Sequence, residues 1–387
     1  MKKLFIVELV CLVTLLWVYW HQVHVPKTRY LKQETALRHL KQDPQLKKPL
    51  APWMFEQIRE DLALSASVSL EAVDLCSFKL RGYYPWIRRY RLVENQLYCY
   101  VPENGELPQE DTHTEKAIRT LTHIRRLPDM DFLVSYLDAY PLESVVPEEL
   151  PAPLLVSGKI RTSYNGILIP DERSIGPWWL GELRMIKKHR IPWGQKEQKA
   201  FWRGGFTKEL RRELCRISLK YPEYLDARIV APTNQQEELE QEGLTGQRCN
   251  WIDLLGYRYL PLLDGVMCAW PAFQGRLFSQ SVTLKPDSEE VQWFYRPLQP
   301  YKHYIPVAKD LSDLIEQLDW AKASDEECQT IAANAYQFAK DHLMFVDIMS
   351  YLLAVLNSYG EKQQANGQLL KDQVAKEELW VNIQRRK

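Results

Sequence analysis

The sequence predicts a mixed α/β protein whose second half contains at least one parallel sheet. In that half, from residue 199 to residue 342, short apolar segments typical of strands alternate with amphipathic segments typical of helices. Glycine-containing turns follow two of the apolar segments, as expected where a strand leads into a helix. A chain of 387 residues can bury a large core, and its length suits two or three domains.

The composition is that of an ordinary globular protein, with 45% hydrophobic and 26% charged residues. The 50 basic residues equal the 50 acidic ones, so net charge gives no reason to expect a nucleic-acid partner. The 13 Trp and 20 Tyr suit sugar binding, because aromatic rings pack against sugar faces, although most such rings belong to the core. The 7 Cys form no C-x-x-C pair and are expected to be mostly free and buried, while a bridge between Cys76 and Cys99 stays open.

The N-terminal segment is expected to anchor the chain in a membrane. An apolar run from Leu4 to Trp20 follows two lysines and contains a single charged residue, Glu8. Its length is at the lower limit for a spanning helix, and no small-residue cleavage site follows it, which favours an uncleaved anchor (residues 1–22) over a signal peptide. A basic stalk (residues 23–52) comes next, and its charges favour a cytoplasmic body.

In chain order, the first half begins with helical segments and continues with short strands. Helical periodicity predicts a helix over residues 114–126, with Leu127-Pro128 as its end. Short apolar segments then predict strands at residues 132–136, 154–156 and 167–169.

The second half gives clearer signals for both kinds of element. The strands that it predicts are residues 199–202, 257–263, 266–269, 282–284 and 304–307. The helices that it predicts are residues 207–220 with Thr207 as N-cap, 272–279, 310–322, 324–342 with a capping box at Ser324 and Glu327, and 347–358. The polar tail, residues 361–387, is expected to be a loose amphipathic helix or disordered.

The two glycine turns are the best candidates for a phosphate site. In residues 201–207, a strand, the turn Gly204-Gly205 and a helix start present free backbone N–H groups and a positive dipole end, to which Arg203 adds a charged donor. A second turn at Gly265 precedes Arg276 in the same way. Together the two turns suit the two phosphates of a nucleotide diphosphate, although each one alone is more often structural.

The chain carries a set of motifs in a fixed order. They are Arg126-Leu127-Pro128-Asp129-Met130 followed by Asp138, Ala200–Gly204, Tyr257-Arg258-Tyr259-Leu260 followed by Gly265-Val266, and Phe294-Tyr295 with His303-Tyr304-Ile305-Pro306-Val307. In these motifs, over residues 118–348, the chain resembles glycosyltransferase family 90, which contains the protein O-glucosyltransferases (Rumi-like) and the related lipopolysaccharide- and capsule-modifying transferases. The resemblance implies a GT-B architecture of two Rossmann-like domains facing across a cleft, an inverting mechanism, a UDP-sugar donor and no metal cofactor.

The resemblance also implies residue roles. Asp138 matches the catalytic base, which takes the proton of the acceptor hydroxyl. Arg203 and Arg276 are expected to stabilise the departing diphosphate, although the spacing before Arg276 is longer here than in the glucosyltransferases. The full set of expected nucleotide-sugar-binding residues is Arg203, Gly204, Thr207, Gly265, Val266 and Arg276. Trp178 and Trp179 match an acceptor-facing loop and are expected either to bind the acceptor or to serve in packing.

On this basis the chain divides into six parts. They are the membrane anchor (1–22), the stalk (23–52), an N-terminal acceptor-side domain (53–195), a C-terminal nucleotide-sugar-binding domain (196–342), a terminal helix packing back across the cleft (343–360) and the polar tail (361–387).

The acceptor is expected to be an envelope glycan, such as lipopolysaccharide or capsule or a lipid-linked glycan, at a bacterial inner membrane that the chain enters through residues 4–20. The cysteines that form a bridge in the secreted animal members are missing, and the chain does not end in an endoplasmic-reticulum retention signal. The alternative is a protein O-glucosyltransferase or O-xylosyltransferase acting on serine.

Two other classes stay open. The D-x-D motif at Asp129 and Asp131 is typical of metal-dependent GT-A transferases, although here it precedes an apolar strand where that class has it follow one. A non-catalytic carbohydrate-binding membrane protein is the other class, against which Asp138 and the two arginines argue. The histidines show no ligand spacing, so the sequence predicts no metal site.

Overall fold

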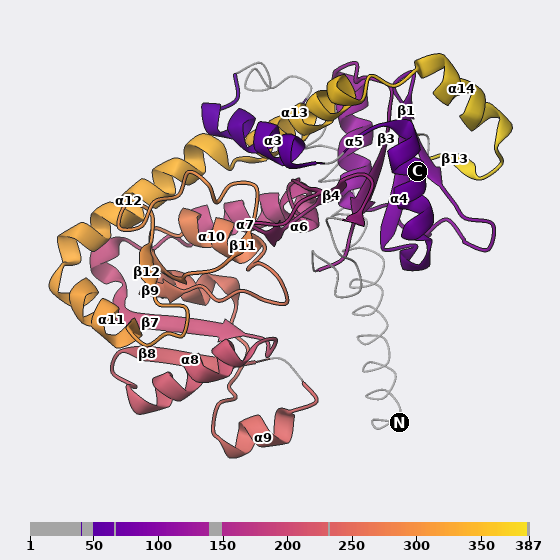
Figure 1. Ribbon diagram of the computed structural model, residues 1–387. Coiled ribbons are helices and arrows are strands. Elements are labelled where there is room, and N and C mark those ends of the chain that lie inside the picture. Colours follow the sequence, from indigo (N-terminus) through magenta and orange to yellow (C-terminus); the bar gives the residue numbers. More distant parts are fainter. Residues whose placement is uncertain (1–39, 41–48, 66, 139–148, 231–232, 385–387) are drawn as a thin grey trace, which may run out of the picture.

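The computed structural model describes residues 40, 49–65, 67–138, 149–230 and 233–384, without the side chains of Pro177 and Trp178. The expected anchor (1–22) and nearly all of the stalk (23–52) lie outside the described residues. Two sheets occupy separate halves of the molecule, and helices surround both (Figure 1). The mixed α/β class predicted from the sequence is therefore confirmed.

The first half is built on a sheet of mixed direction. Across the sheet the strands are β13 (Trp380–Asn382), β2 (Gln96–Tyr100), β1 (Ile87–Val93), β3 (Met130–Ser135), β4 (Leu154–Val156) and β6 (Gly166–Leu168). The pairs β13–β2, β2–β1 and β1–β3 are antiparallel, whereas β3–β4 and β4–β6 are parallel. All six residues of β3 are buried, as is typical of a central strand covered on both faces.

The second half is built on a sheet in which every pairing is parallel. Across the sheet the strands are β12 (Ile305–Val307), β10 (Val282–Pro286), β9 (Tyr257–Pro261), β7 (Glu197–Gly204) and β8 (Leu225–Ile229). The chain winds from β7 to β8 in one direction and then continues from β9 to β12 on the other side of β7. This is the doubly wound order, and the prediction of a parallel sheet in this half is confirmed.

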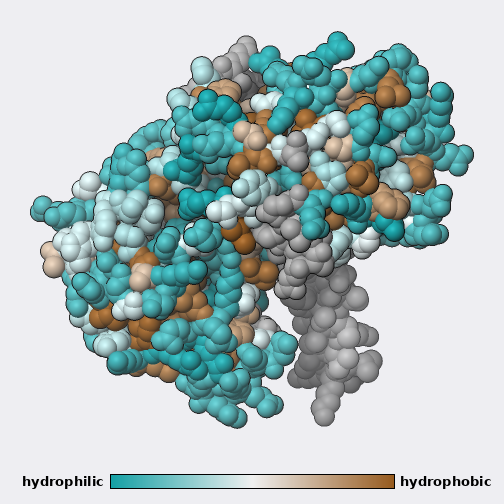
Figure 2. All heavy atoms as spheres, viewed as in Figure 1, coloured by the Kyte–Doolittle hydropathy of each residue, from teal (hydrophilic) through white to brown (hydrophobic). Residues whose placement is uncertain are grey.

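Helices cover both sheets and connect the two halves. In chain order they are α3 (Pro52–Leu64), α4 (Leu70–Lys79), α5 (His113–Ile124), α6 (Glu172–Ile175), α7 (Pro177–Lys188), α8 (Glu209–Lys220), α9 (Gln236–Gln241), α10 (Pro271–Phe278), α11 (Leu314–Ala323), α12 (Asp325–His342), α13 (Phe345–Gln363) and α14 (Gly367–Lys376), with 3-10 turns at Arg81–Tyr83, Trp193–Gln195 and Trp251–Gly256. α12 runs along the second half, and α13 continues from it over the first half (Figure 1). Charged and polar residues cover most of the face seen in Figure 2, and the exposed hydrophobic residues form small separate patches.

α13 fixes the first sheet to the rest of the molecule. The hydroxyl of Tyr351 donates to the carbonyl of Leu168 on β6 at 3.1 Å, and the hydroxyl of Tyr359 donates to the carbonyl of Asp131 on β3 at 3.2 Å. The ring of Tyr351 also stacks on Trp293 of the second half with the centroids 4.5 Å apart. One continuous hydrophobic core therefore extends from the first sheet into the second half.

A second link joins the halves through backbone pairing. β5 (Lys159–Ile160) pairs antiparallel with β11 (Glu290–Val291), and Lys208 at the start of α8 forms an ion pair with Glu290. Lys159 is itself buried and paired with Asp61 of α3, with 2.6 Å between Nζ and Oδ1. The strand that carries Glu290 is thus tied to both halves.

The described part of the polar tail, residues 361–384, is ordered. It forms the helix α14, which agrees with one of the two expected alternatives, and then β13, which the sequence did not predict and which adds an antiparallel edge strand to β2. The ring of Trp380 lies 4.1 Å from the guanidinium carbon of Arg91, which is paired with the buried Asp131. A tryptophan over a buried cation explains why a polar segment docks here.

Three local predictions in the second half were wrong. Residues 266–269 form a loop instead of a strand. The N-cap of α8 is Lys208 and not Thr207, and the side chain of Ser324 makes no capping hydrogen bond at α12. The strand was predicted from a short apolar segment, and the two caps from a polar side chain next to a helix start.

In the part of the chain that the structure describes, no single helix is both long and apolar enough to cross a membrane. The pair α12 and α13 together has the length and composition of a membrane span, but the two helices are bent by 57° relative to each other.

We predict that His303 makes the protein sensitive to acid. Its Nδ1 accepts a hydrogen bond from the backbone N–H of Gln299 at 3.0 Å, and burial lowers the pKa of His303 from 6.5 to about 4. The folded state therefore favours the neutral ring, so this contribution to stability is complete above pH 6.5 and is lost as the pH falls toward 4. Urea unfolding should show a loss of roughly 1–3 kcal/mol over that window.

The control is His303→Asn, because an asparagine oxygen can accept the same backbone hydrogen bond but does not titrate. The variant should lack this part of the acid-induced loss. Identical pH dependence in the two proteins would contradict the assignment.

Candidate active site

The reversal of winding between β7 and β9 defines the candidate site. In doubly wound sheets, ligands bind beyond the carboxyl ends of the two strands at which the winding changes direction. β7 ends in the Gly204-Gly205 turn, and β9 is followed by the segment that contains Gly265. The structure therefore brings together the two glycine turns that the sequence singled out.

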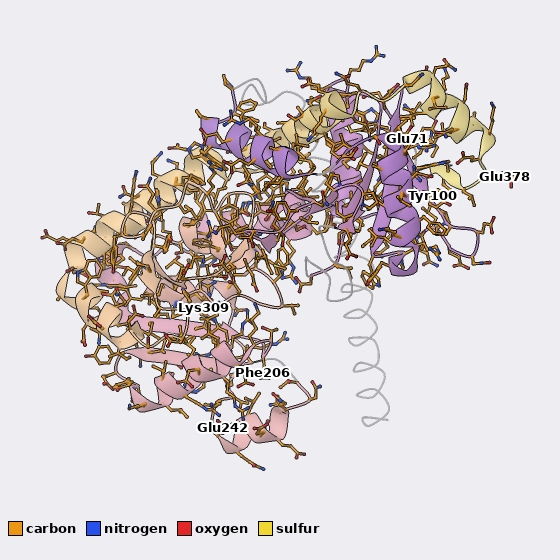
Figure 3. The ribbon with its side chains drawn as sticks, in the orientation of Figure 1. Glu71, Tyr100, Phe206, Glu242, Lys309 and Glu378 are labelled. Carbon is orange, nitrogen blue, oxygen red and sulfur yellow. The ribbon has the colours of Figure 1, made fainter. Side chains whose placement is uncertain are left out.

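Close packing explains the glycine at the first turn. A Cβ added at Gly204 would lie 2.4 Å from Cζ2 of Trp202, because the indole folds back over the end of β7. Phe206, labelled in Figure 3, follows this turn and lies beside the start of α8. At the second turn, the backbone N–H of Gly265 donates to the carbonyl of Cys268 at 3.3 Å, and Val266 is exposed.

Arg211 on α8 holds the two turns together. Its Nη1 donates to the carbonyl of Gly205 at 2.8 Å, while Nε and Nη2 donate to the carbonyls of Asp264 and Leu263 at 2.9 and 3.0 Å. Burial lowers the pKa of Arg211. Arg211 was not among the expected site residues, although it lies one turn before Leu214 and Cys215 on the buried side of a predicted helix.

Arg276 contributes a second guanidinium. It lies on α10, only 4% of it is exposed, and its Nε has no hydrogen-bond partner in the described part of the chain. Burial lowers the pKa of Arg276 to about 9, and the positive charge of Arg211 lowers it further. Among the described residues no carboxylate forms an ion pair with Arg276, so its buried charge favours a nearby anion, whereas the charge of Asp264 acts on Arg211.

Arg203 does not share this position. Its Nη2 donates to Asp226 at 2.8 Å, and its guanidinium carbon lies 4.3 Å from the centroid of the Phe201 ring. The positive charge of Arg203, which was expected to bind a phosphate, is therefore paired with the carboxylate of Asp226 on the neighbouring strand β8. The side chain of Thr207 likewise makes no capping bond to the helix that follows it.

Asp138 lies just after β3, in the first half. It is exposed. Partial burial raises the pKa of its carboxyl, and the indole of Trp270 and the charge of Arg173 oppose this rise only in part. Trp270 directly precedes α10, the helix that carries Arg276.

Trp178 and Trp179 were the two residues expected on the acceptor side. Trp179 is buried, and its ring packs against Phe278 with centroids 5.8 Å apart, which agrees with the packing alternative. The side chain of Trp178 lies outside the described part of the structure. The same loop supplies Ser174, whose Oγ donates to Gln274 Oε1 on α10 at 2.7 Å.

The D-x-D motif is occupied by protein contacts. Asp131 is fully buried and paired with both Arg89 and Arg91. Asp129 accepts a hydrogen bond from the backbone N–H of Glu94 at 2.9 Å. Within the described residues, no group of three or more His, Cys, Asp or Glu side chains has the geometry to hold a metal ion.

The chain was compared with known proteins. The model of glycosyl transferase family 90 matches residues 47–384. Protein O-glucosyltransferase 2 of Danio rerio is 30% identical over 81% of this chain and 63% of its own length. Protein O-glucosyltransferase 3 of Homo sapiens is 29% identical over 72% of this chain and 56% of its own length, so the chain spans less than two thirds of these two relatives. Protein O-glucosyltransferase 1 of Rattus norvegicus is 31% identical over 70% of this chain and 71% of its own length.

We predict that Arg276→Met separates ligand binding from stability. Removing an unpaired buried charge should leave the melting temperature of the free protein unchanged or raise it. Loss of a charged hydrogen bond to a diphosphate should weaken UDP binding by about 10- to 100-fold. Calorimetry with UDP and thermal unfolding without it measure the two effects.

Arg212→Met is the matched control on α8. Arg212 is paired with Glu238 and Glu242 away from the two turns, so its loss should lower the melting temperature and leave UDP affinity unchanged. If Arg276→Met instead lowered the melting temperature and bound UDP normally, Arg276 would be a structural residue.

Proposed function

The chain belongs to glycosyltransferase family 90, and on that premise we propose that it transfers a sugar, with inversion, from a UDP-sugar to a hydroxyl group of a protein. The enzyme class follows from the family itself. The donor, the stereochemistry and the acceptor are the proposal, and the arrangement of Arg276, Arg211 and Asp138 around α10 supports it.

One observation carries the proposal: Arg276, on the helix between β9 and β10, is a buried cation with no carboxylate partner in the described residues. A nucleotide diphosphate supplies two adjacent anionic groups, and the positive charges of Arg211 and Arg276 act on each other. As the bond to the sugar breaks, negative charge develops on the diphosphate. Fixed positive charge stabilises that change more than it stabilises the intact donor.

Asp138 is the proposed base. Its carboxylate takes the proton of the acceptor hydroxyl as the oxygen forms a bond to the anomeric carbon. The bond between that carbon and the diphosphate oxygen breaks on the opposite face, and UDP leaves with the bonding electrons. The raised pKa of Asp138 suits a base, because it strengthens the affinity of the carboxylate for the proton.

The spacing along α10 is consistent with this division of roles. Trp270, whose indole lowers the pKa of Asp138, and Arg276 are separated by six positions, or about 9 Å along a helix axis at ~1.5 Å per residue. A donor could therefore place its sugar toward the start of α10 and its diphosphate toward the end. The two sheets would then correspond to the two halves of a GT-B transferase, with the donor on the second half.

The identity of the acceptor is the least constrained part. The sequence alone favours an envelope glycan as the acceptor, whereas the relatives that match the chain are named protein O-glucosyltransferases. We therefore propose a serine hydroxyl as the acceptor and glucose as the first sugar to test. The proposed membrane anchor at residues 4–20 and the absence of a metal requirement are further parts of the proposal.

Asp138→Asn should abolish transfer and preserve donor binding. We expect the turnover number to fall by about 10²- to 10⁴-fold because the amide cannot accept the proton, with UDP affinity unchanged. Asp129→Asn is the matched control, since the side chain of Asp129 accepts a hydrogen bond from the backbone N–H of Glu94 and lies against Gly367 of α14. It should retain full activity, and so should the wild type in a chelator.

The assay offers UDP-glucose and other UDP-sugars with either a folded serine-containing protein or an envelope glycan. Transfer to the protein with inverted anomeric configuration is the expected result. Transfer to the glycan alone would replace the proposed acceptor. Activity that survives Asp138→Asn but is lost in Asp129→Asn or with chelator would favour a metal-dependent mechanism.

A further inference from the structure

The strand pair β5–β11 joins the ligand-binding edges of the two sheets. In the first sheet β3 and β4 are parallel; Asp138 follows the carboxyl end of β3, and β5 follows the carboxyl end of β4. In the second sheet, β11 follows the carboxyl end of β10, which is parallel to β9. Because β5 pairs with β11, the edge that carries the proposed base is joined to the edge that carries the glycine turns, and Figure 1 shows β11 between the two sheets.

Glu290 is the charged side chain that links this strand pair to the candidate site. It is the first residue of β11 and lies opposite Ile160 of β5. Its Oε1 forms an ion pair with Nζ of Lys208, the residue that caps the start of α8. The carbonyl of Lys208 accepts a hydrogen bond from the backbone N–H of Arg211 at 3.0 Å. The carboxylate of Glu290 is therefore held one turn away from the residue that joins the two glycine turns.

The other carboxylate oxygen of Glu290 has no partner. Oε2 is buried and accepts no hydrogen bond from the part of the chain that the structure describes. The side chain as a whole is 18% exposed, so the carboxylate lies near the surface of the junction. Burial raises the pKa of Glu290, and the ion pair with Lys208 opposes this rise only in part. A carboxylate oxygen in such a position is unfavourable until a hydrogen-bond donor reaches it.

A sugar supplies donors of the right kind. Sugar hydroxyl groups donate hydrogen bonds, and a carboxylate accepts them more strongly than a neutral group does. In the proposed reaction the sugar lies between the diphosphate, which binds on the second half, and Asp138 on the first half. Glu290 is fixed where those two halves meet. A phosphate would not take this position, because its negative charge would repel the carboxylate.

We propose that Glu290 is a specificity-determining residue for the donor: its Oε2 accepts a hydrogen bond from a hydroxyl group of the transferred sugar, while Lys208 holds Oε1. The inference rests on the proposed UDP-sugar donor and adds the group that recognises its sugar. UDP lacks the transferred sugar, so the loss of this contact should weaken the binding of the donor and not that of UDP.

Glu290→Gln tests the inference, because the amide keeps the shape of the side chain and removes its charge. The probes are UDP-glucose, the UDP-deoxyglucoses that each lack one hydroxyl group, and UDP. The wild type should use one of the deoxy analogues at least about 10-fold less efficiently than UDP-glucose. The variant should raise the KM for UDP-glucose by about 10- to 100-fold and lose most of the discrimination against that analogue. Its affinity for UDP, measured by calorimetry, should stay within about twofold.

Glu94→Gln is the matched control. Glu94 also forms an ion pair with a lysine, Lys371 of α14, but on the first half and away from β11. Its loss should leave the KM for UDP-glucose and the discrimination among the deoxy analogues unchanged.

The exchanged pair, Lys208→Glu with Glu290→Lys, separates sugar binding from a structural role. It restores opposite charges between α8 and β11, so the melting temperature should return toward that of the wild type. The discrimination among the analogues should stay lost, because a lysine donates where the hydroxyl group needs an acceptor. Recovery of both would show that the ion pair only supports the fold, and would overturn the inference. The wild type itself tests the inference if the variants do not fold, since equal use of every deoxy analogue would also overturn it.

The inference and the proposed function fail in different ways. If the wild type transfers sugar from no UDP-sugar, the proposed function fails. If UDP-glucose is a donor and Glu290→Gln keeps the KM and the discrimination of the wild type, the donor stands and only the role of Glu290 is wrong.

Discussion

The chain winds outward from β7 in two directions, and that reversal determines where the second half can hold a ligand. The loops after β7 and β9 separate at the same edge of the sheet, because β8 lies on one side of β7 and β9 on the other. Arg211 joins these loops through three backbone carbonyls, and Arg276 adds a buried charge with no carboxylate partner in the described residues. The site is thus defined first by topology and then by two guanidiniums.

Much of this could be predicted from the sequence, because the signals were local. The apolar segments and glycine turns of the second half identified the parallel sheet and both loops at its edge. The amphipathic pattern of residues 114–126 identified α5, whose capping box at Thr112 and Glu115 the structure also shows. Arg276 was singled out as the arginine after the second glycine turn, and the structure shows it buried on α10.

Other features of the candidate site depend on contacts that sequence spacing cannot show. Arg203 is paired with Asp226 of β8, and Trp179 is packed against Phe278 on another helix. Arg211 was overlooked because its partners are backbone carbonyls, which carry no sequence signal. The ordered tail depends on a cation that lies on β1.

We infer that the guanidiniums of Arg211 and Arg276 bind the diphosphate of the donor. A crystal structure of the protein with UDP is the decisive test. The diphosphate should lie beyond the ends of β7 and β9, with a phosphate oxygen within about 3 Å of the Arg276 guanidinium. A nucleotide bound elsewhere, with Arg276 still buried and unpaired, would show that the inference is wrong.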